Sequence, residues 1–446
     1  PQLQAHTTVW VSPEDDIEFR QVELHNLGER SLDIELVSAF EVTLCAQAAD
    51  ESHPAFSNLF VSAQWQAQHQ ALVFARTPRL GGETGLMAAH FLASGDEQVQ
   101  GVRVNVDRSR WLGRNRGAQA PLGLFDAPPD GAGGLAQLPT GLDPVSALAV
   151  RLRIAPRGKA QLTFATAACP DAETLGAVID KYRQPSHVQR ASLMSATLTG
   201  IRLRAMAMGN DTYAAVQSLS TALLLTLARP ADPLPGVCDR RLLWRFGISG
   251  ERALILVHAS LPQGLGLLRS LAQALSLWSW GNVPCDLVVL NAEPASYAMT
   301  LQREIIALRE RHAAQSLARG GQQVTSLVLL RAEELGPDEL STLQALARVQ
   351  INADGRPLVH HVQEWIDAHD AAAQARNDTS TTPLAMVAAG MGGVPVAQGV
   401  FQQQGREFRF DAGSALRPER PWVNVMANAA FGAQLSEAGG GYTWAR

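Results

Sequence analysis

The sequence has few of the residues and motifs on which recognisable catalytic and metal sites depend. Only 4 of its 446 residues are cysteine, and they lie far apart, without the paired spacing of a zinc site. We interpret Cys45, Cys169, Cys238 and Cys285 as free thiols of a reducing compartment, with disulfides or a metal site as the alternatives. A Gly-x-Ser-x-Gly elbow, a Walker loop and a His-Glu-x-x-His motif are also absent. The sequence therefore lacks the signatures of serine hydrolases, P-loop nucleotidases and zinc proteases.

Long hydrophobic runs and a charge imbalance are missing as well. The longest apolar runs, such as residues 221–228, are far too short to span a bilayer, so no membrane contact is predicted. The net charge is only −5, which does not suggest a nucleic-acid surface. With 46% hydrophobic and 18% charged residues the chain is typical of a globular protein of two or three domains. It begins at Pro1 without a signal peptide, and we expect it to be a piece of a larger protein.

Alternating apolar residues near the start of the chain predict β-strands. Side chains alternate between the two faces of a strand, so apolar residues at even positions build one buried face. A preceding apolar run over residues 17–24 changes phase at Arg20 and Gln21, which suggests a β-bulge. Turn residues at 26–30 separate the two runs, and we predict an antiparallel hairpin with one wet face. The even-numbered row consists of Leu32, Ile34, Leu36, Phe40, Val42 and Leu44.

Helical patterns and buried strands follow. A helix is predicted to start after Asp171, and short apolar runs near 253–257, 286–290 and 326–330 alternate with helices, the last over 337–348. This alternation is typical of a small parallel α/β layer. We predict an α+β multidomain chain with a β-sandwich (1–168), a helical segment (169–235), a small α/β domain (236–368), a linker (369–400) and the start of a second β-sandwich (401–446).

An acidic cluster at the entry of a predicted strand is the first candidate for chemistry. Glu14, Asp15, Asp16 and Glu18 are of the residue type that glycoside-cleaving enzymes use. Alternation along the strand directs some of them to solvent, and a solvated or turn-capping role is the favoured interpretation.

Three weaker candidates lie in the predicted α/β domain. Gly264 and Gly266 precede a helix as in a dinucleotide fingerprint, but Arg269 occupies the place of the third glycine, which disfavours nucleotide binding. Adjacent His360 and His361 point about 100° apart on a helix, so a metal site is not expected. The third candidate lies at the end of the second strand of this domain. The residues there could line a pocket, but a role in a turn and in helix capping is favoured: Asn291, Glu293, Ser296 and Tyr297.

Aromatic side chains are the usual contacts of sugars, because flat rings meet the apolar faces of the sugar. Trp10, Trp65, Trp111 and Trp444 are candidates by residue type. Arginines surround Trp111, but a core tryptophan among surface charges is the favoured interpretation at that position.

Many short segments, in the same order along the chain, resemble cyclic β-1,2-glucan synthases, which belong with the family 94 glycoside phosphorylases, formerly glycosyltransferase family 36. They are distributed over nearly the whole chain, which makes the resemblance more specific than any single motif. The matching segments are residues 11–16, 23–26, 50–57, 59–61, 110–114, 142–144, 180–183, 247–250, 286–294, 421–425 and 439–444.

The resemblance implies a galactose-mutarotase-like supersandwich and a membrane-anchored parent that builds cyclic β-1,2-glucan from UDP-glucose on the cytoplasmic side of the bacterial inner membrane. It implies that a catalytic (α/α)₆ barrel, outside this chain, carries the general acid and uses inorganic phosphate. We therefore expect no catalytic residue, cofactor or metal in this chain, and the rest of the parent polypeptide and a β-glucan oligosaccharide as its partners.

The same resemblance places the segment with Tyr442, Trp444 and Arg446 beside the substrate cleft, which makes these three residues the favoured substrate contacts. Two alternative functions remain. The first is a stand-alone carbohydrate-binding or interaction module. The second is a nucleotide-binding enzyme built on residues 242–365, which the incomplete glycine pattern disfavours.

Overall fold

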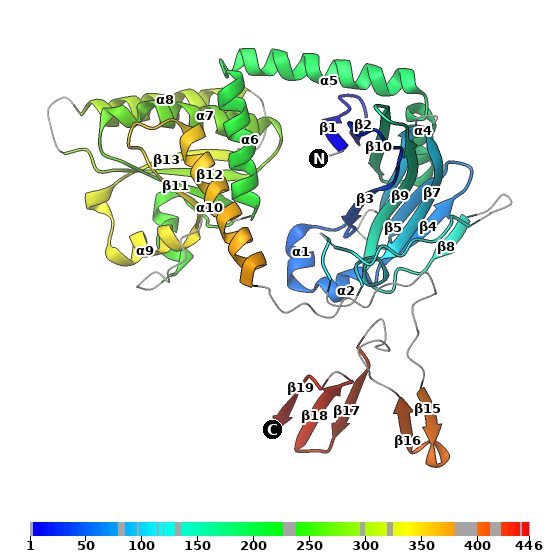
Figure 1. Cartoon of the computed structure of the whole chain (residues 1–446). Coiled ribbons are helices and arrows are strands. Elements are labelled where there is room, and N and C mark those ends of the chain that lie inside the picture. Colours follow the sequence, from blue (N-terminus) through cyan, green and yellow to red (C-terminus); the bar gives the residue numbers. More distant parts are fainter. Residues whose placement is uncertain are drawn as a thin grey trace. The chain divides into compact units, whose positions relative to one another are not determined.

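Two antiparallel sheets form the N-terminal part of the computed structural model (Figure 1). The structure describes residues 3–78, 85–95, 98–113, 116–118, 120–129, 135–225, 238–294, 299–318, 324–379, 399–410, 421–437 and 439–445. The larger sheet contains β1 (Leu3–Val11), β2 (Ile17–Asn26), β10 (Lys159–Cys169), β6 (Leu86–Ser94), β5 (Ala71–Arg76), β4 (Val61–Gln66) and β8 (Leu135–Leu138), in that order. The smaller sheet contains β3 (Leu32–Glu41), β9 (Pro144–Ile154) and β7 (Val99–Asp107).

The central strands of the larger sheet are buried on both of their faces. In β5, Leu72 and Phe74 contribute to the core between the two sheets, whereas Ala71 and Val73 belong to a second core. The second core is completed by the helices that follow β10, α4 (Ala172–Tyr182) and the first turns of α5 (Pro185–Ala205). A strand covered on both sides has no polar face, and therefore reads as a continuous apolar run.

The change of phase in β2 comes from this double burial. Ile17 and Phe19 lie in the core beneath α4, whereas Leu24 is buried in the core between the sheets, with Val22 packed against it. The pairing of β2 with β1 and with β10 continues through Arg20 without a shift of register. The predicted β-bulge is wrong. The apolar residues change face because the first half of β2 is buried beneath α4, whereas the second half is buried against the smaller sheet.

The predicted hairpin is also wrong, because its two strands belong to different sheets. β2 pairs with β1 and β10, so both of its edges are occupied, and β3 pairs with β9 in the smaller sheet. The predicted apolar row of β3 is confirmed, with Ile34, Leu36 and Phe40 packed against the core between the sheets.

A buried asparagine ties together two of the connections by which the chain crosses between the sheets. Asn26, at the end of β2, is fully buried, and its side-chain nitrogen donates to the carbonyl oxygens of Arg30 (2.7 Å) and Ala155 (2.9 Å). Its side-chain oxygen accepts from the backbone nitrogen of Gly28 at 2.9 Å. One of these connections runs from β2 to β3 and the other from β9 to β10, so one amide binds both.

The first helix after β10 begins where the sequence predicts. Asp171 accepts a hydrogen bond from the backbone nitrogen of Thr174 at 2.8 Å, as an N-cap does. α4 and α5 are followed by α6 (Asn210–Leu225). The chain divides into two compact units, 1–198 with 386–446 and 199–385, so the boundary falls within α5. The helices expected as a separate segment are thus shared between the two units.

A four-stranded parallel sheet forms the second unit. Its strand order is β13-β12-β11-β14, with α6 to α8 and α10 on one face and the 3₁₀ helix η1 with α9 on the other. β14 was not predicted: the helix expected over 337–348 ends at Leu346, and the next residues form a strand. The elements are η1 (Arg240–Phe246), β11 (Ala253–Ala259), α7 (Leu265–Trp280), β12 (Cys285–Asn291), α8 (Thr300–Ala318), β13 (Thr325–Arg331), α9 (Pro337–Leu346), β14 (Ala347–Asn352) and α10 (Leu358–Thr379).

Short strands form the described C-terminal residues. α10 continues to Thr379, into the range where a linker was expected, and residues 380–398 lie outside the described ranges. Among the described helices, none has both the length and the hydrophobicity required to cross a bilayer. The two C-terminal sheets consist of β15 (Gly399–Gln402) with β16 (Glu407–Phe410), and of β17 (Val423–Ala427), β18 (Phe431–Ser436) and β19 (Gly441–Ala445).

We predict that His90 makes the sandwich sensitive to acid. Burial, against an opposing hydrogen bond to the Ala165 carbonyl and with a smaller contribution from the charge of Arg20, lowers the pKa of His90 to about 4. The unfolded chain binds a proton near pH 6.5, whereas the folded chain does not, so the free energy of unfolding falls as pH decreases from 6.5 to 4, by about 3 kcal/mol in all. Urea unfolding at pH 7 and at pH 4.5 measures the loss.

The variant His90→Gln removes the titrating group and is expected to flatten this pH dependence. His6→Gln, at an exposed position of β1, is the control and should leave it unchanged. Equal slopes for the wild type and His90→Gln between these pH values would contradict the assignment.

We also predict that Gly264 is required for packing in the α/β unit. A Cβ atom at this position would lie 2.6 Å from both the Cβ and the carbonyl oxygen of Ala353, just after β14. Gly264→Ala is therefore expected to lower the free energy of unfolding by about 1–3 kcal/mol. Gly266→Ala is the matched control, because a Cβ there meets no atom within 4 Å, and it should be neutral or stabilising by up to about 1 kcal/mol. Thermal unfolding distinguishes the two, and equal effects would refute the packing role.

Candidate functional site

The acidic cluster lies in the turn between β1 and β2. The backbone nitrogen of Ser12 donates to the carbonyl oxygen of Ile17 at 3.0 Å, which closes the turn. The backbone nitrogen of Ala168, in β10, donates to the carbonyl oxygen of Asp16 at 3.0 Å and holds the turn against the larger sheet. The hydroxyl of Ser12 is buried and lies 2.8 Å from that of Tyr182, in α4. The turn is therefore fixed on both sides.

Asp15 is the centre of a charged cluster with α4. Its Oδ2 atom accepts from the Lys181 ammonium and from the Tyr182 hydroxyl, both at 2.6 Å. Burial raises the pKa of Asp15, but the hydrogen bonds from Lys181 and Tyr182 outweigh it and hold the pKa below its usual value. The hydrogen bond to Asp15 raises the pKa of Lys181, and burial, together with the same carboxylate, raises that of Tyr182. At neutral pH, Asp15 and Lys181 are charged and Tyr182 keeps its proton.

Glu14 extends this cluster to α5. One carboxylate oxygen accepts from Lys181 at 3.2 Å, and the other accepts from Arg190 at 3.0 Å. Glu18 pairs with Arg20 on the neighbouring part of β2. Three of the four carboxylates thus stabilise the turn or its strand, which is the arrangement expected of a scaffold.

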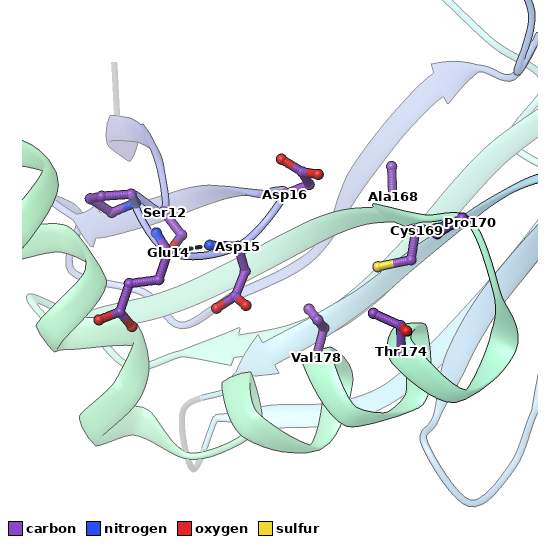
Figure 2. Close-up of a pocket in the computed structure, with 10 residues that line it drawn as sticks. Ser12, Glu14, Asp15, Asp16, Ala168, Cys169, Pro170, Thr174 and Val178 are labelled. Atoms are coloured by element: carbon purple, nitrogen blue, oxygen red, sulfur yellow. Dashed lines mark hydrogen bonds between the residues drawn. The ribbon is translucent and has the colours of Figure 1, made fainter.

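Two hollows border the turn, separated by Asp16 and the end of β10. Figure 2 shows the first, of about 290 Å³, with Asp15 and Asp16 pointing to opposite sides of the chain. The second, of about 580 Å³, lies toward the loop around Cys45. Cys169 lines both, and its pKa is raised by burial and then by the negative charges of Asp16 and Asp171. A protonated thiol is a poor nucleophile, so Cys169 is not an activated cysteine.

Two of the predicted substrate contacts lie side by side on β19. Tyr442 and Trp444 are two residues apart, so they share a face of the strand, and their ring centroids are 5.7 Å apart. The exposed fractions of the two residues are 61% and 40%. Trp444 pairs with Gly432 of β18, where a Cβ would collide with the indole ring, so the ring lies over the backbone of β18. Arg446, the third predicted contact, lies outside the described residues.

The polar residues after β12 cap a helix. The carboxylate of Glu293 accepts from the backbone nitrogens of Leu301 (3.0 Å) and Gln302 (2.9 Å) in the first turn of α8. Asn291 donates to the side chain of Gln302 at 2.6 Å and accepts from the backbone nitrogen of Glu293. Both side chains therefore have partners within the fold. Ser296 and Tyr297, predicted beside them, lie outside the described residues.

The glycine pair is used for packing rather than for a phosphate loop. Strand order reverses between β11 and β14, where nucleotides bind in open α/β sheets. At that place Gly264 is in close contact with Ala353, so the loop packs against the chain that leaves β14. His361, 3.7 Å from Asp354, is buried nearby. Within the described ranges, no three His, Cys, Asp or Glu side chains gather in a way that could hold a metal.

The remaining tryptophan candidates are structural. Trp10 is stacked on Phe19, and both Trp10 and Trp65 are buried in the cores of the sandwich. Trp111 packs against the buried Phe125 cluster. The residues that sequence reasoning missed are Lys181, Tyr182 and Arg190, which bind the acidic turn. The resemblance already included both 11–16 and 180–183, but nothing in the sequence pairs these distant segments.

We predict that Asp15 stabilises the sandwich while its neighbour Asp16 does not. Asp15→Asn removes the charge that Lys181 and Tyr182 hold, and should lower the free energy of unfolding by about 1–3 kcal/mol. Asp16→Asn is the matched control, because the exposed Asp16 carboxylate has no hydrogen-bond partner among the described residues, and a change within about 0.5 kcal/mol is expected. Chemical denaturation at neutral pH compares the two, and equal losses would rule out the assigned role.

Comparison with known proteins agrees with this geometry. The family model described as "Glycosyl hydrolase 94, supersandwich domain" matches residues 1–185 and 406–446. The first range covers the two-sheet sandwich, the acidic turn and α4, and the second covers most of the C-terminal strands.

The chain is also 25% identical, over 98% of its length, to the cyclic beta-(1,2)-glucan synthase NdvB of Rhizobium meliloti. It spans only 16% of the length of that relative. Because the family model matches just over half of its residues, the chain belongs to the glycosyl hydrolase 94 family, of which it carries the supersandwich domain.

Proposed function

We propose that the chain is a non-catalytic, carbohydrate-associated region of a cyclic β-1,2-glucan synthase, whose phosphorylase-like part acts on β-1,2-glucan chains. The similarity to the glucan synthase of Rhizobium meliloti along 98% of the chain supports this proposal. Family membership supports it independently, through the supersandwich domain. The rest of such a synthase would include the catalytic (α/α)₆ barrel and a membrane anchor, with this region on the cytoplasmic side of the inner membrane.

The ionisation of the acidic turn carries the non-catalytic part of the proposal. Cleavage of a glycosidic bond needs a carboxylic acid that keeps its proton near neutral pH, hence one with a raised pKa. The Asp15 pKa is shifted in the opposite direction, and Glu14 is held by two cations. Asp15 is thus unsuited to protonate a leaving group, and in this proposal the general acid lies in the barrel.

Tyr442 and Trp444 supply the carbohydrate contact in this proposal. Exposed, neighbouring rings on one strand face offer a flat apolar surface to the C–H faces of a sugar chain. The same surface favours the second candidate function, a carbohydrate-binding module that acts without any barrel. Arg446 would add hydrogen bonds to hydroxyl groups, as guanidinium groups do.

Titration with β-1,2-glucooligosaccharides tests both parts. We expect quenching of tryptophan fluorescence by the sugar, with affinity about tenfold weaker in Trp444→Ala, because one aromatic contact is lost. With phosphate added, no glucose 1-phosphate should form.

Trp244→Ala is the control, since Trp244 is 56% exposed but lies in the α/β unit. It should leave the affinity unchanged. Release of glucose 1-phosphate would refute the non-catalytic role. Affinity that is unchanged in Trp444→Ala would refute the contact alone.

A further inference from the structure

The two sandwich sheets have four edges, and three of them carry a recognisable protection against pairing with other chains. Edge strands are usually protected from pairing with another chain because they are short, carry charged side chains or are covered by another segment. β8 has only four residues, and β3 carries the exposed acids Asp33, Glu35 and Glu41. β7 is covered by a bridge in which Val104 and Asp126 exchange backbone hydrogen bonds of 2.9 and 3.0 Å.

The fourth edge, β1, has none of these protections. It is nine residues long and contains no proline, glycine, lysine, arginine or acidic residue. It pairs with β2 along its whole length without a bulge, and no other described strand pairs with it. Its free edge therefore offers a straight row of backbone donors and acceptors, flanked by Val9 and Val11, each 55% exposed.

The exposed apolar residues of β1 lie on the face that leads to the core between the sheets. Residues opposite each other in an antiparallel pair share a face. Ala5 lies opposite Leu24, and Thr7 opposite Val22, both of which belong to that core or pack against it. Val9 and Val11 continue the same row by alternation. The core-side face of β1 therefore extends the apolar interior of the sandwich to the edge of the sheet, where no described segment covers it.

We propose that β1 pairs antiparallel with β1 of a second copy of this chain, which joins two seven-stranded sheets into one. The sequence of the strand is self-complementary in the register that pairs all nine residues about a two-fold axis at Thr7. No like charges meet in it, and apolar side chains face apolar ones across the axis on the core-side face. The opposed pairs are Leu3 with Val11, Ala5 with Val9, Thr7 with Thr7, Gln4 with Trp10 and His6 with Thr8.

Self-complementarity is what favours a second copy over an unrelated strand. An arbitrary partner would need its own matching row, whereas a copy supplies it automatically. Strand addition at a free edge takes its affinity from main-chain hydrogen bonds and its specificity from alternate side chains. Thr7 lies on the proposed two-fold axis and is the single residue of β1 that pairs with its own copy. A charge placed at Thr7 would therefore face the same charge in the partner.

A charge swap at Thr7, read by sedimentation velocity on the full chain, tests the proposal. The wild type is expected to dimerise as its concentration rises. Thr7→Lys and Thr7→Glu each place like charges directly opposite one another and should raise the dissociation constant at least about tenfold. An equimolar mixture of the two variants should restore the dimer, because lysine then faces glutamate. Thr7 is exposed, so both substitutions are compatible with the folded chain.

Thr197→Lys is the matched control, an exposed threonine on α5 that should leave dimerisation intact. Recovery in the mixture excludes misfolding as the cause of dissociation. A wild type that stays monomeric at every concentration would overturn the proposal and leave the edge to a strand of another polypeptide. A dimer insensitive to both Thr7 variants, or one that Thr197→Lys abolishes equally, would also overturn it.

Discussion

The central strands of the seven-stranded sheet must bury both of their faces, and most of the sandwich follows from that requirement. The smaller sheet covers one face, and α4 with the beginning of α5 covers the other. Covering one face with the smaller sheet requires the chain to leave the larger sheet and return, which it does after β2, β6 and β8. A crossing exposes backbone groups that must find partners, and the buried amide of Asn26 supplies them at the β2–β3 and β9–β10 connections.

The second covering layer also determines the chemistry of the acidic turn. α4 contributes Leu175 and Ile179 to the core and, at its end, Lys181 to the carboxylates. The turn is therefore held by the same helix that excludes water from the sheet beneath it. A pair with one half-buried partner is stabilised only when its hydrogen bonds are well formed, and the hydroxyls of Tyr182 and Ser12 complete them. Carboxylates arranged in this way fix a helix to a strand.

Local patterns in the sequence predicted the elements much better than their partners. The even-numbered row of β3, the cap at Asp171 and the parallel strands around β11 to β13 depend on neighbouring residues, and they were predicted. The change of phase in β2 was misinterpreted as a β-bulge, because its apolar residues belong to two different cores. β14 was missed because it follows α9 without a turn residue. Lys181 could not be joined to Asp15 by any local signal, and the one link was the resemblance, which contained both segments but not their contact.

The pairing of β2 with β10 has a consequence for the order in which the sandwich can assemble. β2 cannot complete its ladder until Lys159–Cys169 has emerged from the ribosome, and the acidic turn must wait still longer for α4. Pairing between strands so distant in sequence is slow, because the intervening chain has to be ordered first. During synthesis the uncharged β1 and half-paired β2 are therefore exposed for longer than any other strands of the larger sheet. This interval is when the chain is most vulnerable to aggregation.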